Sequence, residues 1–304
     1  MNEKFKLIEE RLPKFYALME SCRLCPRKCG VNRLNNEIGY CKTGKDLKIA
    51  SWADHRGEEP PISGTKGSGA IFSSNCTLSC CFCQNYPFSQ LGNGSIITIK
   101  KLAEIYDLLA KKGVHNINWV TPTHVLPMLL DAWLLAGDAA HKLPIVYNCS
   151  GYETPEVLEM LAGIVDIFLP DIKYADNRSA VAFSGCPGYV EANRAALKKM
   201  HEIAGYLKTD FETGLASKGM IIRHLVLPND ISGTENCLRW LKAELGTDIH
   251  LSVMCQYFPA YKALENDLLN KPLPDSDYVR VLDLVEELGF ENVWAQDPFE
   301  PGGA

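Results

Sequence analysis

The sequence predicts an α/β protein built on a parallel β-sheet that is closed, or partly closed, into a barrel. From about residue 69 onward, short apolar segments alternate with longer amphipathic segments, which is the pattern of strand–helix units in a parallel sheet. The 304 residues, 46% of them apolar and 22% charged, suffice for one large α/β domain with a full core or for two smaller domains. The number of strand–helix units favours the barrel.

The first part of the chain is organised differently from the rest. Apolar residues at helical spacing predict a helix over residues 1–20. Residues 21–45 are rich in Cys, Gly and Asn and are expected to form an irregular knuckle. Residues 46–55 have the composition of a strand, whereas residues 56–69 contain so much Gly and Pro that we expect a loop, whose glycines would let the backbone approach a cofactor or substrate.

Seven short apolar segments predict the strands of the barrel, and amphipathic segments between them predict its helices. The strands are expected at 70–74, 117–121, 144–148, 166–170, 221–227, 250–255 and 292–296. The helices are expected at 99–113, 155–163, 191–205, 234–245 and 278–289. We therefore expect an N-terminal helix and knuckle over residues 1–60 and a barrel over residues 61–304.

Charge and hydropathy exclude several classes of partner. The net charge of −6 does not favour binding to DNA or RNA. The first fifteen residues contain no apolar core of signal-peptide length, and the apolar run at 125–137 is too short to span a bilayer and is interrupted by Pro127 and Asp131. We expect a cytoplasmic protein that binds neither nucleic acid nor a membrane.

The distribution of the twelve cysteines indicates metal binding. Thiols in the cytoplasm are kept reduced, so a disulfide framework is not expected. Eight of the cysteines fall within residues 22–83, in two clusters. The other four are scattered singly and are interpreted as small buried apolar side chains: Cys149, Cys186, Cys237 and Cys255.

The second cluster follows the first predicted barrel strand, at the edge where barrels place their chemistry. Its spacing is Cys76-x3-Cys80-x2-Cys83. Three thiolates suit a 4Fe–4S cluster that keeps one iron open. A structural zinc ion needs four ligands, and the fourth would have to be Cys81, whose side chain should point away from that of Cys80. The spacing therefore favours an open-iron cluster over zinc.

The run Cys76-x3-Cys80-x-Phe82-Cys83 resembles the CX3CXΦC signature of the radical S-adenosylmethionine (radical SAM) enzymes. The resemblance covers about residues 60–297 and is greatest to the pyruvate formate-lyase activating enzyme branch. Within it, the chain is similar to uncharacterised activase-like iron–sulfur proteins that carry CPRxCGVNR before the cluster and QNYxxSQ after it. The resemblance implies a partial or near-closed (β/α)6-type barrel with an N-terminal Cys-rich extension. It also implies a 4Fe–4S cluster, S-adenosylmethionine as cofactor, and contact of Phe82 with adenine.

The resemblance implies further cofactor-binding residues after the second and third strands. In relatives a Gly-Gly-Glu stretch after the second strand binds the amine of S-adenosylmethionine. This chain departs from that pattern and offers Thr121, Thr123 and His124, although His124 is equally well interpreted as a loop histidine with a structural role. Asn148 and Ser150 end the third strand, where relatives contact the ribose and carboxylate.

The ends of the fourth and sixth strands also carry residues that match relatives. Asp171 and Lys173 match the Asp-x-Lys pair that closes the fourth strand of activases and are the candidate catalytic residues. A plain ion pair is the alternative, but residues i and i+2 at a strand end share one face and would both point to the barrel mouth. Gln256 and Tyr257 compete for an adenosine contact after the sixth strand.

Arg223 lies inside an apolar strand, as in activases. A buried guanidinium requires an anionic partner, and its fork geometry suits the carboxylate of S-adenosylmethionine. Strand alternation turns His224 to the opposite face, so we expect a structural role for it.

The knuckle carries the first cysteine cluster, Cys22-x2-Cys25-x3-Cys29-x11-Cys41. Four cysteines make a closed site for zinc or for an auxiliary 4Fe–4S cluster, and a disulfide is the weakest interpretation. The spacing does not decide between the two metals. The Cys-x2-Cys-Pro run resembles ferredoxin-type hooks and slightly favours the iron–sulfur cluster.

The functional hypothesis is a radical SAM enzyme that abstracts a hydrogen atom. The resemblance implies activation of a glycyl radical enzyme, with a protein or peptide substrate and a flavodoxin- or ferredoxin-type electron donor. Modification of a ribosomal peptide or a small molecule is an alternative within the superfamily. A zinc-binding interaction module is the alternative from another class, and it predicts a colourless protein where the iron–sulfur hypothesis predicts a brown one.

Overall fold

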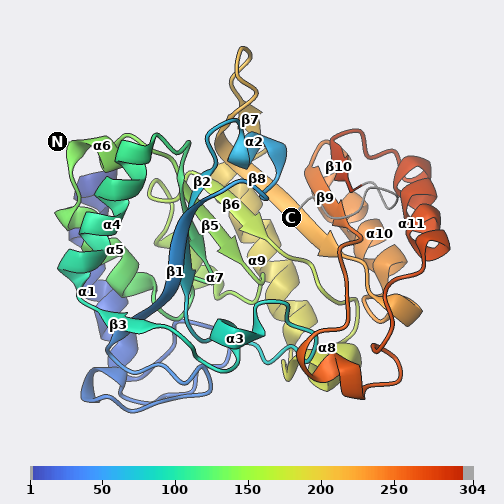
Figure 1. The fold of residues 1–304 in the computed structure, drawn as a ribbon, viewed down its shortest axis with the longest axis horizontal. Helices are drawn as coiled ribbons and strands as arrows, with labels where there is room; N and C mark the ends of the chain where they lie inside the picture. Colours follow the sequence, from blue (N-terminus) through green and yellow to red (C-terminus); the bar gives the residue numbers. More distant parts are fainter. Residues whose placement is uncertain (1–2, 297–304) are drawn as a thin grey trace.

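A single curved, mixed β-sheet organises the protein, as a computed structural model describing residues 3–296 shows (Figure 1). Its main path has the order β10-β9-β8-β6-β5-β4-β2-β1-β3, and β7 pairs with β8. The strand bounds are β1 Leu47–His55, β2 Ser68–Ser73, β3 Ser95–Ile97, β4 Ile117–Val120, β5 Ile145–Cys149, β6 Ile167–Pro170, β7 Lys208–Thr209, β8 Ala216–Leu225, β9 His250–Met254 and β10 Val293–Ala295.

Most of the sheet is parallel, as the strand–helix alternation predicts. Every neighbouring pair from β2 through β4, β5, β6, β8 and β9 to β10 is parallel, whereas β1 is antiparallel to both β2 and β3. Within residues 3–296 the two edge strands, β3 and β10, do not pair with each other, so the barrel is open. The α/β fold and the partial barrel are thus confirmed.

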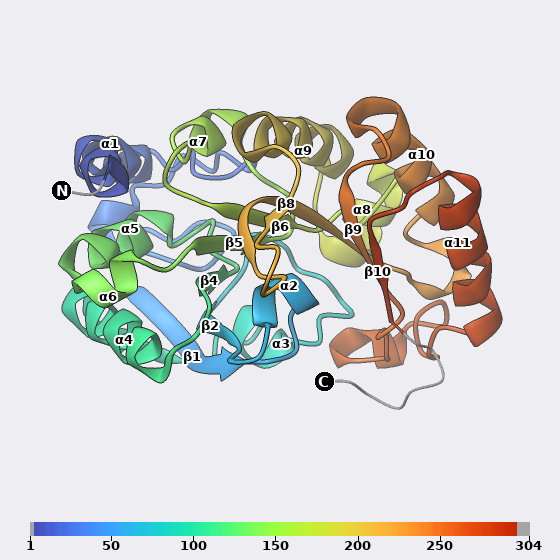
Figure 2. The same cartoon turned by 90° about the horizontal axis from the view of Figure 1, so that it is seen from above.

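The longer helices form a layer outside the curve of the sheet (Figure 2). All expected helices are present, and five further helices lie outside the ranges expected from the sequence: α2, α3, α5, α6 and α8. The bounds of the α-helices are α1 Glu3–Glu20, α2 Pro60–Ser63, α3 Tyr86–Ser89, α4 Ile99–Lys112, α5 Leu126–Leu135, α6 Asp138–His141, α7 Pro155–Glu159, α8 Asn177–Ser184, α9 Tyr189–Ala204, α10 Thr234–Leu245 and α11 Asp275–Glu287. Short 3-10 turns lie at η1 Arg33–Asn35, η2 Pro228–Asp230 and η3 Tyr261–Glu265.

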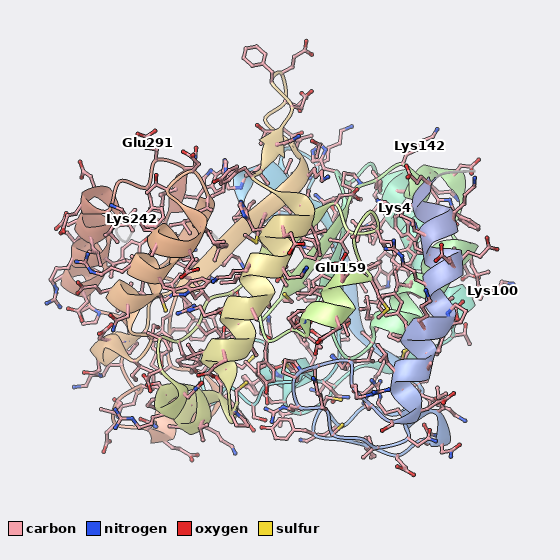
Figure 3. The ribbon with its side chains drawn as sticks, turned by 180° about the vertical axis from the view of Figure 1, so that it is seen from behind. Lys4, Lys100, Lys142, Glu159, Lys242 and Glu291 are labelled. Atoms are coloured by element: carbon pink, nitrogen blue, oxygen red, sulfur yellow. The ribbon has the colours of Figure 1, made fainter. Side chains whose placement is uncertain are left out.

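The helical layer buries the apolar outer face of the sheet and turns charged side chains to solvent. Figure 3 shows this layer from behind, with Lys4 on α1, Glu159 on α7 and Lys242 on α10. Lys4 also pairs with Asp166, which immediately precedes β6, and so ties α1 to the sheet. In the described part of the chain, no helix is long and apolar enough to cross a membrane.

The outer face of the sheet is apolar, whereas the inner face is apolar only at the end next to the loop 56–69. The predicted loop at 56–69 contains the short helix α2, which lies at the end of the sheet where β2 begins (Figure 1). Its Ile62 packs with the inward side chains of Val146, Ile167 and Ile221. Toward the carboxyl ends of the strands, the inner face becomes polar and charged.

Candidate functional site

The four-cysteine loop lies at the carboxyl end of β2, between this strand and α3 (Figure 1). The structure brings Cys76, Cys80 and Cys83 together closely enough that Cys80 and Cys83 each raise the pKa of Cys76. Burial is the larger cause of that rise, and it also raises the pKa of Cys80 to about 11. The nearby ammonium of Lys173 opposes this rise at Cys80.

Each of the three sulfur atoms has a hydrogen-bonding neighbour. The hydroxyl of Ser184 donates to Cys80 Sγ at 3.0 Å. Cys83 Sγ lies 3.1 Å from Ser89 Oγ, and the Leu78 amide donates to Cys76 Sγ at 3.4 Å. Donors of this kind stabilise thiolates and tune the potential of iron–sulfur clusters.

The three thiols lie on one short loop at Cys76, Cys80 and Cys83, with the spacing of cluster ligands. Across residues 3–296, no three His, Cys, Asp or Glu side chains are grouped as a metal-ion site. A cubane cluster binds each cysteine at a different iron atom, so its ligands need not converge on one point. The trio of Cys76, Cys80 and Cys83 therefore fits a 4Fe–4S cluster.

Cys81 and Phe82 take separate positions on the same loop. Cys81 lies near Lys262, and its amide donates to the carbonyl of Phe183 at 2.8 Å. Phe82 is buried and meets Tyr257 edge to face, with ring centroids 6.2 Å apart. Gln84 Nε2 donates to the carbonyl of Gln256 at 2.7 Å, so the loop contacts the chain just after β9. The cofactor roles predicted for Phe82, Gln256 and Tyr257 stay predictions.

Arg223 lies at the centre of a charged group on the inner face of the sheet. Its Nε donates to Asp171 Oδ1 at 3.0 Å, and the other oxygen of Asp171 lies 2.6 Å from Lys173 Nζ. Burial alone would raise the pKa of Asp171, but Arg223 and Lys173 outweigh it and hold this pKa below its ordinary value. Asp171 and Lys173 thus form an ion pair, which Arg223 extends across to β8, and their catalytic role stays a prediction.

The protein itself supplies the anionic partners that a buried guanidinium requires. Besides Asp171, Arg223 lies 3.5 Å from Glu58 Oε2 and donates to Asn148 Oδ1 at 2.6 Å. Asn118 and Asn148 both donate to Glu58 Oε1 at 3.1 Å. Contact between Arg223 and the carboxylate of S-adenosylmethionine stays a prediction. The protein's own side chains already pair with the guanidinium.

Glu58 and Glu59 are candidate site residues that we did not predict from the sequence. With Arg223 and Gln256 they line a cavity of about 410 Å³ between the loop before α2 and strands β8 to β10. Glu59 is only 8% exposed, and its Oε2 has no hydrogen-bond partner within the described residues. Burial raises its pKa, and neighbouring Glu58 raises it further, although Arg223 opposes them.

The segment after β4 is bound to other protein groups. Thr123 Oγ1 donates to Glu153 Oε1 at 2.6 Å, and His124 Nε2 lies 2.7 Å from the carbonyl of Ser74. Burial lowers the pKa of His124 to about 4, so the ring is neutral near pH 7. These contacts agree with the structural alternative for His124. Thr121 has a left-handed φ of 57° and hydrogen-bonds through its amide to Asn148.

Two further predicted residues have clear structural contacts. The carbonyl of Ser150 accepts a hydrogen bond from Tyr189 at 3.0 Å. His224 is buried, with Nδ1 2.7 Å from the carbonyl of Ile172 and Nε2 2.9 Å from Thr234 Oγ1. The structural role expected for His224 agrees with these contacts.

The knuckle gathers its four cysteines, although they do not converge on one point. Burial raises the pKa of Cys25 to about 12, and Cys41 and Cys22 contribute to the rise. Burial also raises the pKa of Cys29, and neighbouring Cys22 raises it further. Four neighbouring thiols fit a closed metal or cluster site, and the identity of that metal stays a prediction.

Comparisons with known proteins agree with the iron–sulfur interpretation. The model of the radical SAM superfamily matches residues 70–216, which include the cysteine loop and the Asp-x-Lys pair. An uncharacterized protein of Methanocaldococcus jannaschii is 28% identical over 286 residues, covering 91% of this chain and 78% of that protein. Its description assigns it no activity.

Similar solved structures share low sequence identity with this chain. A maturase of the FeFe-hydrogenase is 10% identical with a TM-score of 0.48, and the similarity covers 73% of this chain and 48% of that one. Methylornithine synthase is 15% identical with a TM-score of 0.45, and 75% and 70% of the two chains are covered. Residues 70–216, with the CX3CXΦC loop inside them, are thus similar to the radical SAM superfamily.

Proposed function

We propose that this protein is a radical SAM enzyme in which Cys76, Cys80 and Cys83 hold a 4Fe–4S cluster. The observation that carries the proposal is the grouping of these three buried or half-buried thiols at the carboxyl end of β2. When bound and reduced, such a cluster supplies the electron that cleaves S-adenosylmethionine to a 5′-deoxyadenosyl radical, which then abstracts a hydrogen atom.

The residues of the inner face would bind and orient the reactants. Arg223 fixes Asp171 and Glu58 in place, and Lys173 lies close enough to Cys80 to lower the pKa of its thiol. The cavity beside Arg223 has room for part of a substrate or of S-adenosylmethionine. Its charged wall favours a polar ligand group, and the buried position of Phe82 limits water near the cluster loop.

We further propose a protein or peptide substrate, as the resemblance to glycyl-radical-enzyme activases implies. The Asp-x-Lys pair of Asp171 and Lys173, which matches the pair in activases, supports this proposal. A reduced flavodoxin or ferredoxin would supply the electron. The knuckle, if it holds a second 4Fe–4S cluster rather than zinc, would lie on that electron path.

The proposed activity is tested by measuring the amount of 5′-deoxyadenosine formed. The protein is reconstituted with iron and sulfide without oxygen, reduced with dithionite and given S-adenosylmethionine. We expect 5′-deoxyadenosine from wild type and from Cys81→Ala, but background amounts from Cys80→Ala. A colourless protein that retains zinc, or a wild type with a full cluster and no product, would overturn the proposal.

A further inference from the structure

The N-terminal knuckle contacts the cysteine loop directly, at residues between and beside the proposed cluster ligands. We infer that Arg27 and Tyr40 of the knuckle are positioning residues that fix the loop 74–85 against the end of α8 and so keep the Ser184 hydroxyl on the sulfur of Cys80. The cluster-binding role of the loop rests on the proposed function, whereas the contact itself belongs to the protein without any cofactor.

Arg27 joins two segments that are far apart in the sequence. Its Nε donates to the carbonyl of Thr77 at 2.6 Å, and its Nη2 donates to the carbonyl of Gly185 at 2.7 Å. Thr77 lies between Cys76 and Cys80, and Gly185 directly follows α8. A guanidinium can make both bonds at once because its donors are fixed in a planar fork.

Tyr40 covers this fork and adds a second link to the same two segments. The guanidinium carbon of Arg27 lies 3.3 Å from the centroid of the Tyr40 ring. The Tyr40 hydroxyl donates to Ser79 Oγ at 2.8 Å and approaches the Gly185 carbonyl at 3.3 Å. Gly185 has a φ of 55°, and a Cβ at this position would lie 2.6 Å from that hydroxyl, so the close approach requires glycine.

The C-terminal end of the knuckle contacts Asn75, the residue before the first proposed cluster ligand, Cys76. Asn75 has a left-handed φ of 71°, and its amide side chain donates to Thr43 Oγ1 at 3.1 Å and to the Lys42 carbonyl at 3.3 Å. Lys42 and Thr43 directly follow Cys41, so the contact with Asn75 lies next to the fourth cysteine of the knuckle.

The Arg27 contact continues to a ligand sulfur through one residue. Gly185 follows Ser184, whose hydroxyl donates to Cys80 Sγ at 3.0 Å and whose carbonyl accepts from the Ser79 amide at 2.9 Å. Arg27 thus fixes the end of α8 that presents a donor to Cys80. Without it, we expect the loop amides to open more often and the Ser184–Cys80 bond to weaken.

Hydrogen exchange of the cofactor-free protein tests the positioning role independently of any cluster. Arg27→Lys keeps the charge but loses the planar fork that reaches Thr77 and Gly185 together, and we expect amides in residues 74–85 to exchange about tenfold faster than in wild type. Arg23→Lys is the matched control, because the Arg23 side chain is exposed and has no hydrogen-bond or ion-pair partner among residues 3–296. Exchange in 74–85 within twofold of wild type would overturn the inference.

Tyr40→Phe provides a second variant in case Arg27→Lys accelerates exchange throughout the protein. It removes only the hydroxyl that bonds to Ser79, at a residue that is 41% exposed. Faster exchange confined to residues 74–85 supports the inference, and unchanged exchange there refutes it.

The reconstituted protein supplies a readout that a purely structural role would not move. Iron content of Arg27→Lys should equal that of wild type, whereas the midpoint potential of the cluster should fall. The potential falls because a weaker Ser184 hydrogen bond stabilises the more negative, reduced cluster less well. A change of charge does not contribute, because lysine and arginine carry the same charge. An unchanged potential and an unchanged electron paramagnetic resonance spectrum would contradict the inference. If no cluster forms in wild type, the proposed function fails, while the exchange result still decides whether the knuckle holds the loop.

Discussion

Replacing Arg223 should cost far more stability than replacing an exposed arginine. Arg223→Met removes the cation that lies between Asp171 and Glu58, with side chains only 17%, 13% and 8% exposed, respectively. Asp171 keeps Lys173 at 2.6 Å, but Glu58 loses its cationic partner and keeps only the two asparagine donors. Breaking a buried ion pair from one side costs about 3–5 kcal/mol, so we expect a loss of that size in the free energy of unfolding.

Urea unfolding of the cofactor-free protein measures this loss. The urea concentration at the midpoint should fall, while the dependence of the unfolding free energy on urea concentration stays unchanged. Arg239→Met is the matched control, since Arg239 pairs with Glu235 at 2.8 Å but is 50% exposed. That variant should lose about 0–1 kcal/mol. The double variant Arg223→Met/Glu58→Gln should lose less than the sum of its single variants, because the unpaired carboxylate is gone. Equal losses for Arg223→Met and Arg239→Met would show that Arg223 contributes no more stability than an exposed ion pair.

Two further predictions concern a buried carboxylic acid and the knuckle. Burial raises the pKa of Glu153 to about 7, so its stabilising contribution is fully present below the ordinary glutamate pKa of about 4.3 and is lost as the pH rises through about 7. In urea, Glu153→Gln should therefore lose less stability than wild type between about pH 5 and pH 8, and an equal loss would contradict the raised pKa. The triple variant of Cys76, Cys80 and Cys83 to alanine should still bind metal at the knuckle, and elemental analysis that finds neither iron nor zinc would exclude that site.

The sequence predicted the strands and most helices because their signals are local. The apolar segments at 70–74 and 166–170 became β2 and β6, and Thr234–Leu245 became α10 with the predicted bounds. Helix α8 was missed because it has only 8 residues, and its apolar residues are consecutive rather than spaced by three or four. Its boundary signals were nevertheless present: the Asp176 side chain accepts hydrogen bonds from two amides of the first turn, and Gly185 ends the helix.

The candidate site was predicted less completely because several of its contacts join distant segments. Glu58 and Glu59 lie in a Gly- and Pro-rich stretch that resembles an exposed loop, and only the folded chain brings them to Arg223. The need of Arg223 for an anion was correctly inferred, but Asp171 and Glu58 meet that need within the protein. Periodicity and residue spacing carry no information about such pairs.

We propose that Cys76, Cys80 and Cys83, but not Cys81, hold one 4Fe–4S cluster. This proposal is tested most directly by counting iron and acid-labile sulfide in four single alanine variants after reconstitution without oxygen. Replacing Cys76, Cys80 or Cys83 should remove about four iron and four sulfide atoms per chain relative to wild type, whereas Cys81→Ala should remove none. An equal loss from Cys81→Ala, or full iron and sulfide in the other three variants, would contradict the account.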